Sequence, residues 1–290
     1  MDNYSLKLFL TLAENLHFGR TSQICNISRS ALSRQIQRLE DEAGQKLFER
    51  DNRMVSLTPA GIRFAEYASQ VVDLWKELSE ELLEDKNILK GELSLYCSVT
   101  ACYSILPDIL TEFRRKYPQI HIILKTGDAS EAVSHVQEGR TDIAIAAKPD
   151  RLSSSIGFRQ ITETPLIFIV PAVEWAYSGC PPDQLPWGEV PMILPERELA
   201  RSRIDLWFRD KEIRPNVYAQ VSGNEAILAM VNLGCGVGVI PKLVFEKRPF
   251  EVDVIPIEID PPLKPYSLGL CVQQRRLNSP LIKSFWQIVR

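Results

Sequence analysis

The pattern of hydrophobic and polar positions changes twice along the chain, near residue 57 and near residue 91. Before the first change it predicts short helices joined by tight turns, and between the two changes it predicts one long helix. After residue 91, short apolar runs alternate with helical segments, which is typical of an α/β domain. A chain of 290 residues is long enough for two or three compact units with at least one large core.

The first segment, residues 1–58, is predicted to form three helices and a wing. Apolar residues recur at helical spacing over residues 5–16, and a second short helix is expected over 19–25. Ser28 is a natural N-cap for a third helix, which should end near Ala43. Two short strands around a polar turn are expected to follow, and together these elements predict an all-α winged helix-turn-helix.

The second segment, residues 59–89, is predicted to be a long helix that begins after the Thr58 cap. Its apolar residues alternate four and three apart, so they form one narrow stripe between acidic faces. The residues of this stripe are Phe64, Ala68, Val71, Trp75, Leu78 and Leu82. Such a stripe favours pairing with a second helix in a dimer, and the alternative is a helix that lies on its own domain.

The third segment, residues 90–290, is predicted to form two α/β lobes. A strand–helix–strand–helix–strand order over residues 93–147 indicates a mostly parallel sheet covered by helices. Further strands and helices alternate up to the C-terminus. We expect lobe I to comprise about residues 90–161 and 267–290, and lobe II about residues 162–266, with a cleft between the lobes at their hinge.

The third helix of the first segment has one apolar face and one face of basic and polar residues. From Arg20 to Arg38 there are four arginines and no acidic residue. Arginine, glutamine and serine side chains can bind base edges in the major groove of DNA. We expect Ser30, Ser33, Arg34 and Gln37 to face the groove, and Arg29, Arg38 and the wing residue Arg53 to lie nearer the phosphates. The alternative is an ordinary solvated helix face.

Composition adds little to this picture. The net charge of −3 neither supports nor excludes DNA binding, because phosphate contacts come from a local patch. No apolar run approaches the ~18 residues of a membrane span, and the N-terminus does not resemble a signal peptide, so a cytoplasmic protein is expected. The six scattered cysteines are interpreted as small buried residues, with a redox-sensing pair as the alternative. The three histidines form no metal-ligand cluster, and no metal or cofactor is expected.

Several segments resemble the signature of the LysR-type transcriptional regulators. They are FGRTSQICNIS at residues 18–28, ALSRQIQRLE at 31–40, LTPAG at 57–61 and GCGVGVIP at 234–241. The resemblance covers the whole chain. It implies a winged helix-turn-helix, a linker helix that dimerises, and an effector domain shaped like a periplasmic binding protein. It also implies promoter DNA and RNA polymerase as partners, and a homodimer or homotetramer.

A second set of segments is similar to those members of the family that activate a branched-chain amino-acid biosynthesis gene. The set includes FERDNR at residues 48–53, CSVTACYS at 97–104, TGDA at 126–129, AIAAKP at 144–149 and RIDLWFR at 203–209. This resemblance implies the acetohydroxy acids acetolactate and acetohydroxybutyrate as inducers. A regulator of another pathway with a different small carboxylate effector is the alternative.

An acetohydroxy acid carries a carboxylate, a hydroxyl and a ketone, so its site should offer oriented donors and one cation. Strand ends that face helix N-termini are where such ligands bind in α/β sheets. We therefore expect the effector site to include Ser98, Thr100, Thr126, Arg201, Arg203, Asn224 and Glu225. Here the two arginines would supply the cation, and Asn224 or Glu225 would close the cleft. The alternative for each residue is a helix cap or a surface ion pair.

Two other functions fit less of the sequence. A solute-binding protein would explain the two lobes but not the helix-turn-helix. A small-molecule enzyme would need a nucleophile and a base at a recognisable spacing, which the sequence lacks, so no enzymatic activity is expected. The glycines at 234, 236 and 238 follow a predicted helix and enter a strand, which favours tight packing over a dinucleotide-binding loop.

Overall fold

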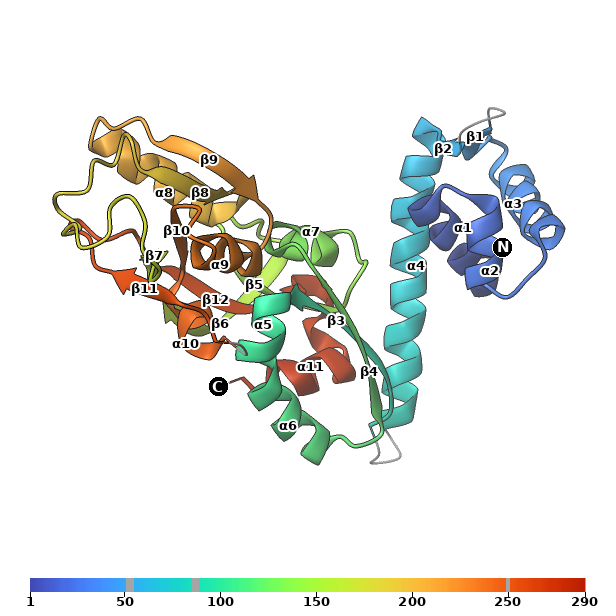
Figure 1. Ribbon diagram of the computed structural model, residues 1–290. Helices are drawn as coiled ribbons and strands as arrows, with labels where there is room; N and C mark the ends of the chain where they lie inside the picture. Colours follow the sequence, from blue (N-terminus) through green and yellow to red (C-terminus); the bar gives the residue numbers. More distant parts are fainter. Residues whose placement is uncertain (51–54, 85–88, 249–250, 290) are drawn as a thin grey trace. The chain divides into compact units, whose positions relative to one another are not determined.

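The computed structural model describes residues 1–50, 55–84, 89–248 and 251–289. The chain forms two compact units, Met1–Asn87 and Ile88–Arg290 (Figure 1). Each unit has its own hydrophobic core, and the cores draw on the apolar faces that the sequence pattern predicts.

The first unit contains four helices and a two-stranded sheet within the described residues. They are α1 (Asn3–Asn15), α2 (Phe18–Ile24), α3 (Arg29–Ala43), β1 (Phe48–Arg50), β2 (Val55–Leu57) and α4 (Pro59–Glu84). The strands are antiparallel, with Phe48 opposite Leu57. The Phe9 ring lies 5.2 Å from that of Phe48 and 4.8 Å from that of Phe64, so α1, the wing and α4 share one core.

The ends of α3 follow from two local signals. The Ser28 hydroxyl accepts a hydrogen bond from the Ala31 N–H at 3.1 Å, which satisfies a free donor of the first turn. Gly44 ends the helix in the left-handed conformation, with φ of +64°. The predicted helix-turn-helix and wing are therefore present. The predicted wing residue Arg53 lies outside the described residues.

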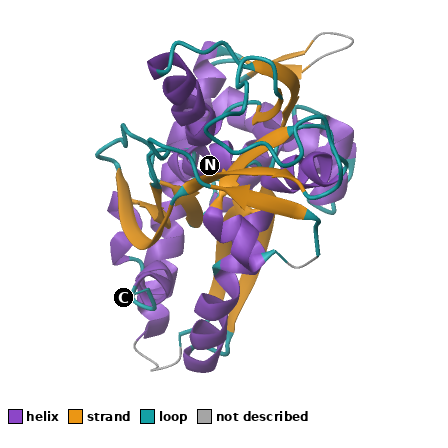
Figure 2. Cartoon of the chain, turned by 60° about the vertical axis from the view of Figure 1, so that its left-hand side comes forward, coloured by secondary structure: helices purple, strands orange, loops and turns teal. Residues whose placement is uncertain are grey.

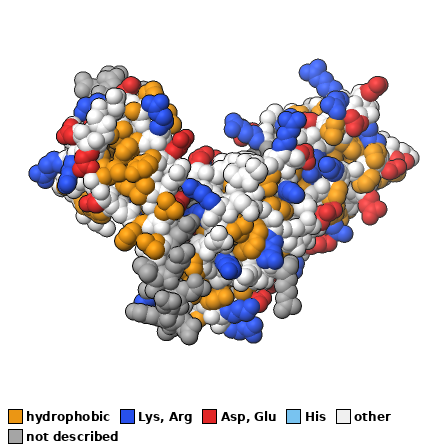
Figure 3. Space-filling model, turned by 180° about the vertical axis from the view of Figure 1, so that it is seen from behind, with side chains coloured by type: hydrophobic (Ala, Val, Ile, Leu, Met, Phe, Trp, Pro, Cys, Tyr) orange, Lys and Arg blue, Asp and Glu red, His pale blue; other side chains and the backbone are white. Residues whose placement is uncertain are grey.

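The apolar stripe of α4 is divided between two environments. Ala68 is fully buried, and Phe64 and Val71 pack against the same core. These three residues were predicted to belong to the dimerisation stripe, but they contribute to the core of their own unit. Trp75 and Leu78 remain 57% and 47% exposed, and the neighbouring Leu74 is 64% exposed. Leu82 belongs to the part of α4 whose side chains are not described. Exposed hydrophobic side chains appear in orange on the surface in Figure 3.

In the second unit, lobe I contains a five-stranded sheet in the order β4-β3-β5-β12-β6. Its strands are β3 (Gly91–Ser98), β4 (Ile120–Gly127), β5 (Ile143–Ala147), β6 (Ile156–Thr164) and β12 (Tyr266–Gln273). β3 is parallel to β4 and β5, whereas β12 is antiparallel to β5 and β6. The sheet is therefore mixed, because β12, which follows lobe II in the sequence, runs antiparallel to its neighbours. The pattern did not predict β6, which pairs with β12 along the length of that strand.

Side-chain alternation along the strands of lobe I assigns the covering helices to two faces. Leu93 and Leu95 pack toward α5 (Val99–Ser104), α6 (Leu106–Lys116) and α11 (Pro280–Trp286). Tyr96 belongs to the opposite cluster, which contains residues of α7 (Ala132–Gln137). A period of two thus buries both faces of the sheet, and Figure 2 shows the strands in orange and the helices in purple.

Lobe II contains a second five-stranded sheet, in the order β11-β7-β10-β8-β9. Its strands are β7 (Leu166–Pro171), β8 (Pro191–Pro195), β9 (Asn216–Val221), β10 (Val237–Pro241) and β11 (Val254–Ile257). The helix α8 (Glu198–Asp210) contributes to one core cluster, and α9 (Asn224–Asn232) and α10 (Lys242–Lys247) contribute to another. The edge strand β11 and the helix α10 were not predicted, since both are too short for a periodic pattern.

The glycines at 236 and 238 bring α9 and β8 close to β10, as the sequence interpretation predicted. A Cβ atom at Gly236, where φ is +145°, would lie 2.2 Å from the carbonyl oxygen of Pro191. A Cβ atom at Gly238 would lie 2.5 Å from the Ile227 side chain of α9. This packing fixes the position of α9, whose first residues line the cleft described below.

One predicted helix of lobe I is divided in two. The pattern predicts a helix from about residue 102 to 117, whereas the structure has α5 and α6 with a break at Ile105. Pro107 near the start of α6 lacks an N–H and favours the beginning of a new helix. The first helix also begins earlier than predicted, because Ser98 caps it and Val99 belongs to α5 rather than to the strand.

A buried ion pair joins the C-terminal part of lobe I to its sheet. The Arg276 guanidinium lies 2.7 Å from the Asp142 carboxylate, and these side chains are 3% and 4% exposed. We expect Arg276→Leu to lower the free energy of unfolding of the second unit by about 3–5 kcal/mol, because it leaves a buried carboxylate without its cation. Urea denaturation would measure this, with the exposed Arg275→Leu as control. Equal stability of the two variants would contradict the expectation.

Candidate DNA-binding surface and effector pocket

The face of α3 that was predicted to read DNA is at the surface of the first unit. Arg34 and Gln37 are exposed, and so are Arg29, Ser30 and Arg38. Ser33 is half-buried. The opposite face of the helix supplies Leu32, Ile36 and Leu39 to the core, each at most 2% exposed. Packing of the apolar face therefore leaves the basic and polar face accessible to a ligand as large as DNA.

The exposed side chains of α3 differ in how firmly they are held. Gln37 donates to the Asp41 carboxylate at 2.8 Å and accepts from the Lys46 ammonium at 3.1 Å. Arg38 pairs with Glu42, one turn along the helix, at 3.2 Å. Neither Arg29 nor Arg34 makes a hydrogen bond or ion pair with the described part of the chain. Their guanidinium groups are thus available to phosphates or bases without breaking an internal contact.

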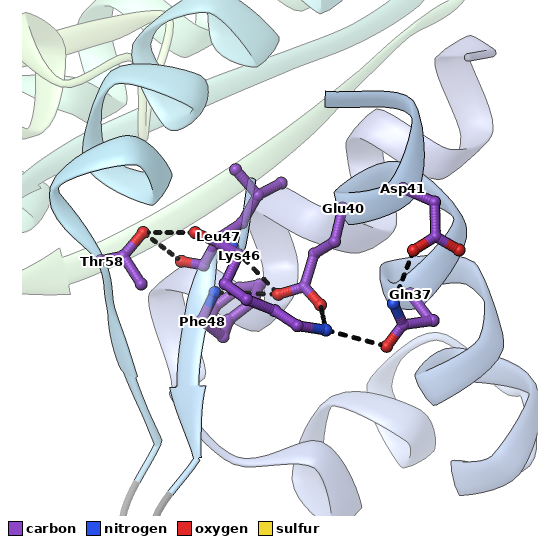
Figure 4. A network of polar contacts seen from close by, with 7 residues as sticks. All are labelled: Gln37, Glu40, Asp41, Lys46, Leu47, Phe48 and Thr58. Carbon is purple, nitrogen blue, oxygen red and sulfur yellow. Dashed lines mark hydrogen bonds and ion pairs between the residues drawn. The ribbon is translucent and has the colours of Figure 1, made fainter. Parts of the chain in front are cut away.

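A buried carboxylate attaches α3 to the wing (Figure 4). Glu40 is 3% exposed, and its Oε1 atom accepts hydrogen bonds from the backbone N–H groups of Leu47 at 2.9 Å and Phe48 at 3.1 Å. Its Oε2 atom pairs with the Lys46 ammonium at 2.9 Å. Thr58 completes the link, since its hydroxyl donates to the Lys46 carbonyl at 2.7 Å. The orientation of α3 relative to the wing and to α4 follows from these contacts.

The environment of Glu40 favours its charged form. Burial alone raises the pKa of the carboxyl, but hydrogen bonds from Lys46, Phe48 and Leu47 together outweigh it and hold the pKa below its usual value of 4.5. A lowered folded-state pKa stabilises the fold above the unfolded-state pKa. This contribution is lost as the pH falls below about 4.5 and through the lower folded-state value.

We expect Glu40→Ala to destabilise the first unit by about 2–4 kcal/mol, because two buried N–H groups and one ammonium lose their acceptor. The loss should shrink as the pH falls below 4.5 and through the lower folded-state pKa, because the wild-type carboxylate then becomes protonated as well. Urea unfolding of the full chain at pH 7 and at a series of pH values below 4.5 would measure both effects. Glu42→Ala, on the exposed side of the same helix, should change the stability by less than about 1 kcal/mol.

The second unit contains a cavity of about 370 Å³ between its lobes. One part of the wall is apolar and includes Val133, Ile145 and Leu268 from lobe I and Leu199 and Leu243 from lobe II. Another part carries hydroxyl and amide groups, from Ser98, Thr100, Ser104, Ser130, Ser134, Gln137 and Asn224. A smaller cavity of about 210 Å³ adjoins it and shares Ser98, Thr100, Ala129 and Asn224. The volume and the mixed lining of the larger cavity are typical of a small-molecule site.

Four of the predicted effector residues lie together at this cleft. Thr100 is 6% exposed, and its hydroxyl donates to the Glu225 carboxylate at 2.7 Å. The Asn224 amide lies 3.4 Å from the same hydroxyl. The Ser98 hydroxyl accepts from the Ala101 N–H at 3.2 Å, so it caps α5 while it also lines both cavities. The Ser98 side chain therefore acts as a helix cap and is also part of the wall of both cavities.

Thr126, Arg201 and Arg203 do not line either cavity. Thr126 is an exposed residue of β4, which continues for one more residue to Gly127. Gly127 and the following Asp128 line the smaller cavity in its place. Arg201 pairs with Asp205 at 2.8 Å one turn along α8, and the wall is formed instead by its neighbours Leu199 and Ala200.

Arg203 is buried behind the cleft rather than in it. Its guanidinium lies 5.2 Å from the centre of the Tyr266 ring, and it donates to the Lys264 carbonyl at 2.9 Å. Burial lowers the pKa of Arg203, and the nearby Asp150 partly offsets this. Tyr266 itself lines the larger cavity, so Arg203 packs against a wall residue and does not line the cavity itself.

Several residues of the cleft were not predicted from the sequence. Ser130, Ser134 and Gln137 recur four and three apart, and all line the larger cavity. This polar stripe on a short helical segment was a usable signal, because helical spacing places such residues on one face. The contact of the Tyr103 hydroxyl with Glu225, at 3.3 Å, was not predicted either, although Tyr103 itself lines neither cavity.

The cysteines are all free, and two of them are poorly suited to redox chemistry. Burial raises the pKa of both Cys97 and Cys271 to about 12, which disfavours the reactive thiolate. No cluster of metal-ligating side chains occurs within the described residues. None of the described helices has the length and apolar character that a membrane span requires.

Comparison with known proteins assigns both units to the same protein family. The model of the bacterial regulatory helix-turn-helix protein, lysR family, matches residues 4–62, and that of the LysR substrate binding domain matches residues 86–290. The chain is 43% identical over 298 residues to the HTH-type transcriptional activator IlvY of Salmonella typhimurium, covering 100% of this chain and 99% of the relative. It is 39% identical to IlvY of Haemophilus influenzae, with full coverage of both proteins.

The predicted fold class is confirmed by a solved structure. A full-length OxyR variant from Pseudomonas aeruginosa is 21% identical, with a TM-score of 0.70 over 100% of this chain and 95% of that chain. At this identity the likeness shows the fold alone: a winged helix-turn-helix, a linker helix and a two-lobed α/β domain.

Proposed function

The chain belongs to the LysR family of DNA-binding transcription regulators, and from that membership we propose that it activates a branched-chain amino-acid biosynthesis gene in response to an acetohydroxy acid. The IlvY activators to which it is similar over its full length support the pathway. The observation that carries the effector class is the cleft, whose wall combines neutral hydrogen-bond donors with apolar side chains.

In this proposal α3 enters the major groove of promoter DNA. Ser30, Ser33, Arg34 and Gln37 face the base edges, and Arg29 and Arg38 bind phosphates, with Arg53 in the wing. Arg34 is the strongest candidate for base recognition, because it is exposed, has no internal partner in the described part of the chain and can bind guanine through two donors.

We expect Arg34→Ala to weaken binding to the cognate promoter by about 10- to 100-fold, which corresponds to ~1–3 kcal/mol for one bidentate base contact. Gel-shift titration at fixed salt would measure the affinity. Arg209→Ala is the matched control, since Arg209 is exposed on lobe II. Unchanged affinity in the Arg34 variant, with both proteins folded, would contradict the proposed surface.

The cleft suits an acetohydroxy acid in two respects. The hydroxyl and amide groups of Thr100, Ser98 and Asn224 can bind the carboxylate and hydroxyl of the ligand, and Val133 and Leu243 can pack against its alkyl groups. The expected cation is absent from this arrangement, because no Lys, Arg or His lines either cavity among the described residues. Recognition of the carboxylate then depends on neutral hydrogen-bond donors.

We expect Thr100→Ala to lower the affinity for acetolactate and acetohydroxybutyrate at least about tenfold and to leave promoter affinity unchanged, because it removes a buried donor from the cleft. Isothermal titration calorimetry would measure the ligand affinity. Thr111→Ala, at an exposed position of α6, is the control. Normal titration of the Thr100 variant would defeat its assigned role, and binding of a different carboxylate in place of these two would favour another pathway.

We further propose that the exposed part of the α4 stripe pairs two chains. Leu74, Trp75 and Leu78 are exposed apolar residues on one stretch of helix, and burial against a second copy would remove them from water. A dimer, alone or within a tetramer, would present two α3 helices to two half-sites of the promoter. RNA polymerase is the further partner that activation requires.

A further inference from the structure

The Glu225 carboxylate connects the two lobes at the cleft. Glu225 lies in the first turn of α9 in lobe II, and its Oε1 atom accepts hydrogen bonds from Thr100 at 2.7 Å and Tyr103 at 3.3 Å, both in α5 of lobe I. The Thr100 hydroxyl has a single proton, so while it donates to Glu225 it cannot donate to another acceptor.

A second carboxylate–hydroxyl contact joins the lobes beside the first. The Ser222 hydroxyl of lobe II donates to the Asp128 carboxylate of lobe I at 2.8 Å. Both carboxylates line the smaller cavity, next to Ser98 and Asn224. Within the described residues, neither cavity is lined by a cationic side chain. A carboxylate ligand placed against Thr100 would therefore meet a like charge at short range, which is unfavourable.

We propose that Glu225 is an internal competitor of the effector. Its carboxylate occupies the Thr100 donor that the carboxylate of an anionic effector requires, so the effector binds only when Glu225 moves away. That movement breaks the Thr100–Glu225 contact between the lobes, which links occupancy of the cleft to the angle between the lobes. This inference rests on the proposed function for the class of ligand. It assigns to Glu225 the role of opposing the ligand rather than binding it.

The substitution Glu225→Gln separates the two roles, because glutamine keeps the size and the acceptor oxygen of glutamate but carries no charge. We expect this variant to bind acetolactate about tenfold more tightly than the wild type in calorimetric titrations. The uncharged methyl ester of acetolactate should gain less from the substitution than acetolactate does, since it meets no like-charge repulsion. Glu258→Gln, at an exposed position of lobe II, is the control and should match the wild type.

Weaker or unchanged acetolactate binding by Glu225→Gln would overturn the inference, and weaker binding would show that Glu225 accepts a hydrogen bond from the ligand. If Glu225→Gln does not fold, Glu225→Ala replaces it, and this variant is also expected to bind acetolactate more tightly than the wild type. Lactate and citrate are titrated in parallel. Tighter binding of one of these, with no binding of acetohydroxy acids, would support the competitor and reject the proposed effector. Failure of every carboxylate to bind any variant would overturn both.

Discussion

The DNA-binding unit depends on the buried carboxylate of Glu40. This one side chain satisfies the backbone N–H groups of Leu47 and Phe48, where the chain leaves α3 and enters the wing, and it also binds the Lys46 ammonium. An unpaired carboxylate at 3% exposure would be strongly destabilising, so the contacts form together or not at all. The position of Arg34 relative to the wing is a consequence of this arrangement.

The effector domain uses a carboxylate in the opposite way. Glu225 is half-buried and is held by hydroxyl groups alone, whereas Glu40 is fully buried and is held by backbone N–H groups and a cation. Backbone groups cannot leave their partner without unfolding of the local structure, but hydroxyl groups rotate to another acceptor at little cost. Glu40 is therefore a permanent structural contact, and Glu225 is one that a ligand can replace.

The cleft joins these local features to regulation. Its wall is built from residues of both lobes, and α9 holds its place because Gly236 and Gly238 allow β10 to approach β8 and α9 closely. A ligand that contacts both walls has a different affinity for each angle between the lobes, and that difference is what shifts a conformational equilibrium. Among the described residues the walls carry no cation, so the cleft offers hydrogen-bond geometry, the size of its apolar part and the Asp128 and Glu225 carboxylates as means of ligand selection.

The sequence by itself determined the elements whose causes are local. Ser28 and Gly44 mark the ends of α3, the helical period identifies its apolar face, and the alternation after residue 91 indicates the α/β lobes. Ser98, Thr100, Asn224 and Glu225 were also predicted for the cleft, because strand ends and helix starts are recognisable in a sequence.

Only the tertiary structure decided which surface each face meets. Helical period shows that the stripe of α4 is apolar, but not that Ala68 packs on its own core while Trp75 stays exposed. For the same reason the sequence pattern predicted Arg203 in the cleft, whereas the structure has it buried against Tyr266. The partner of Thr100 lies 125 residues away along the chain, and no local pattern encodes a contact of that separation. Periodicity specifies the chemical character of a face, whereas packing of the whole chain specifies its partner.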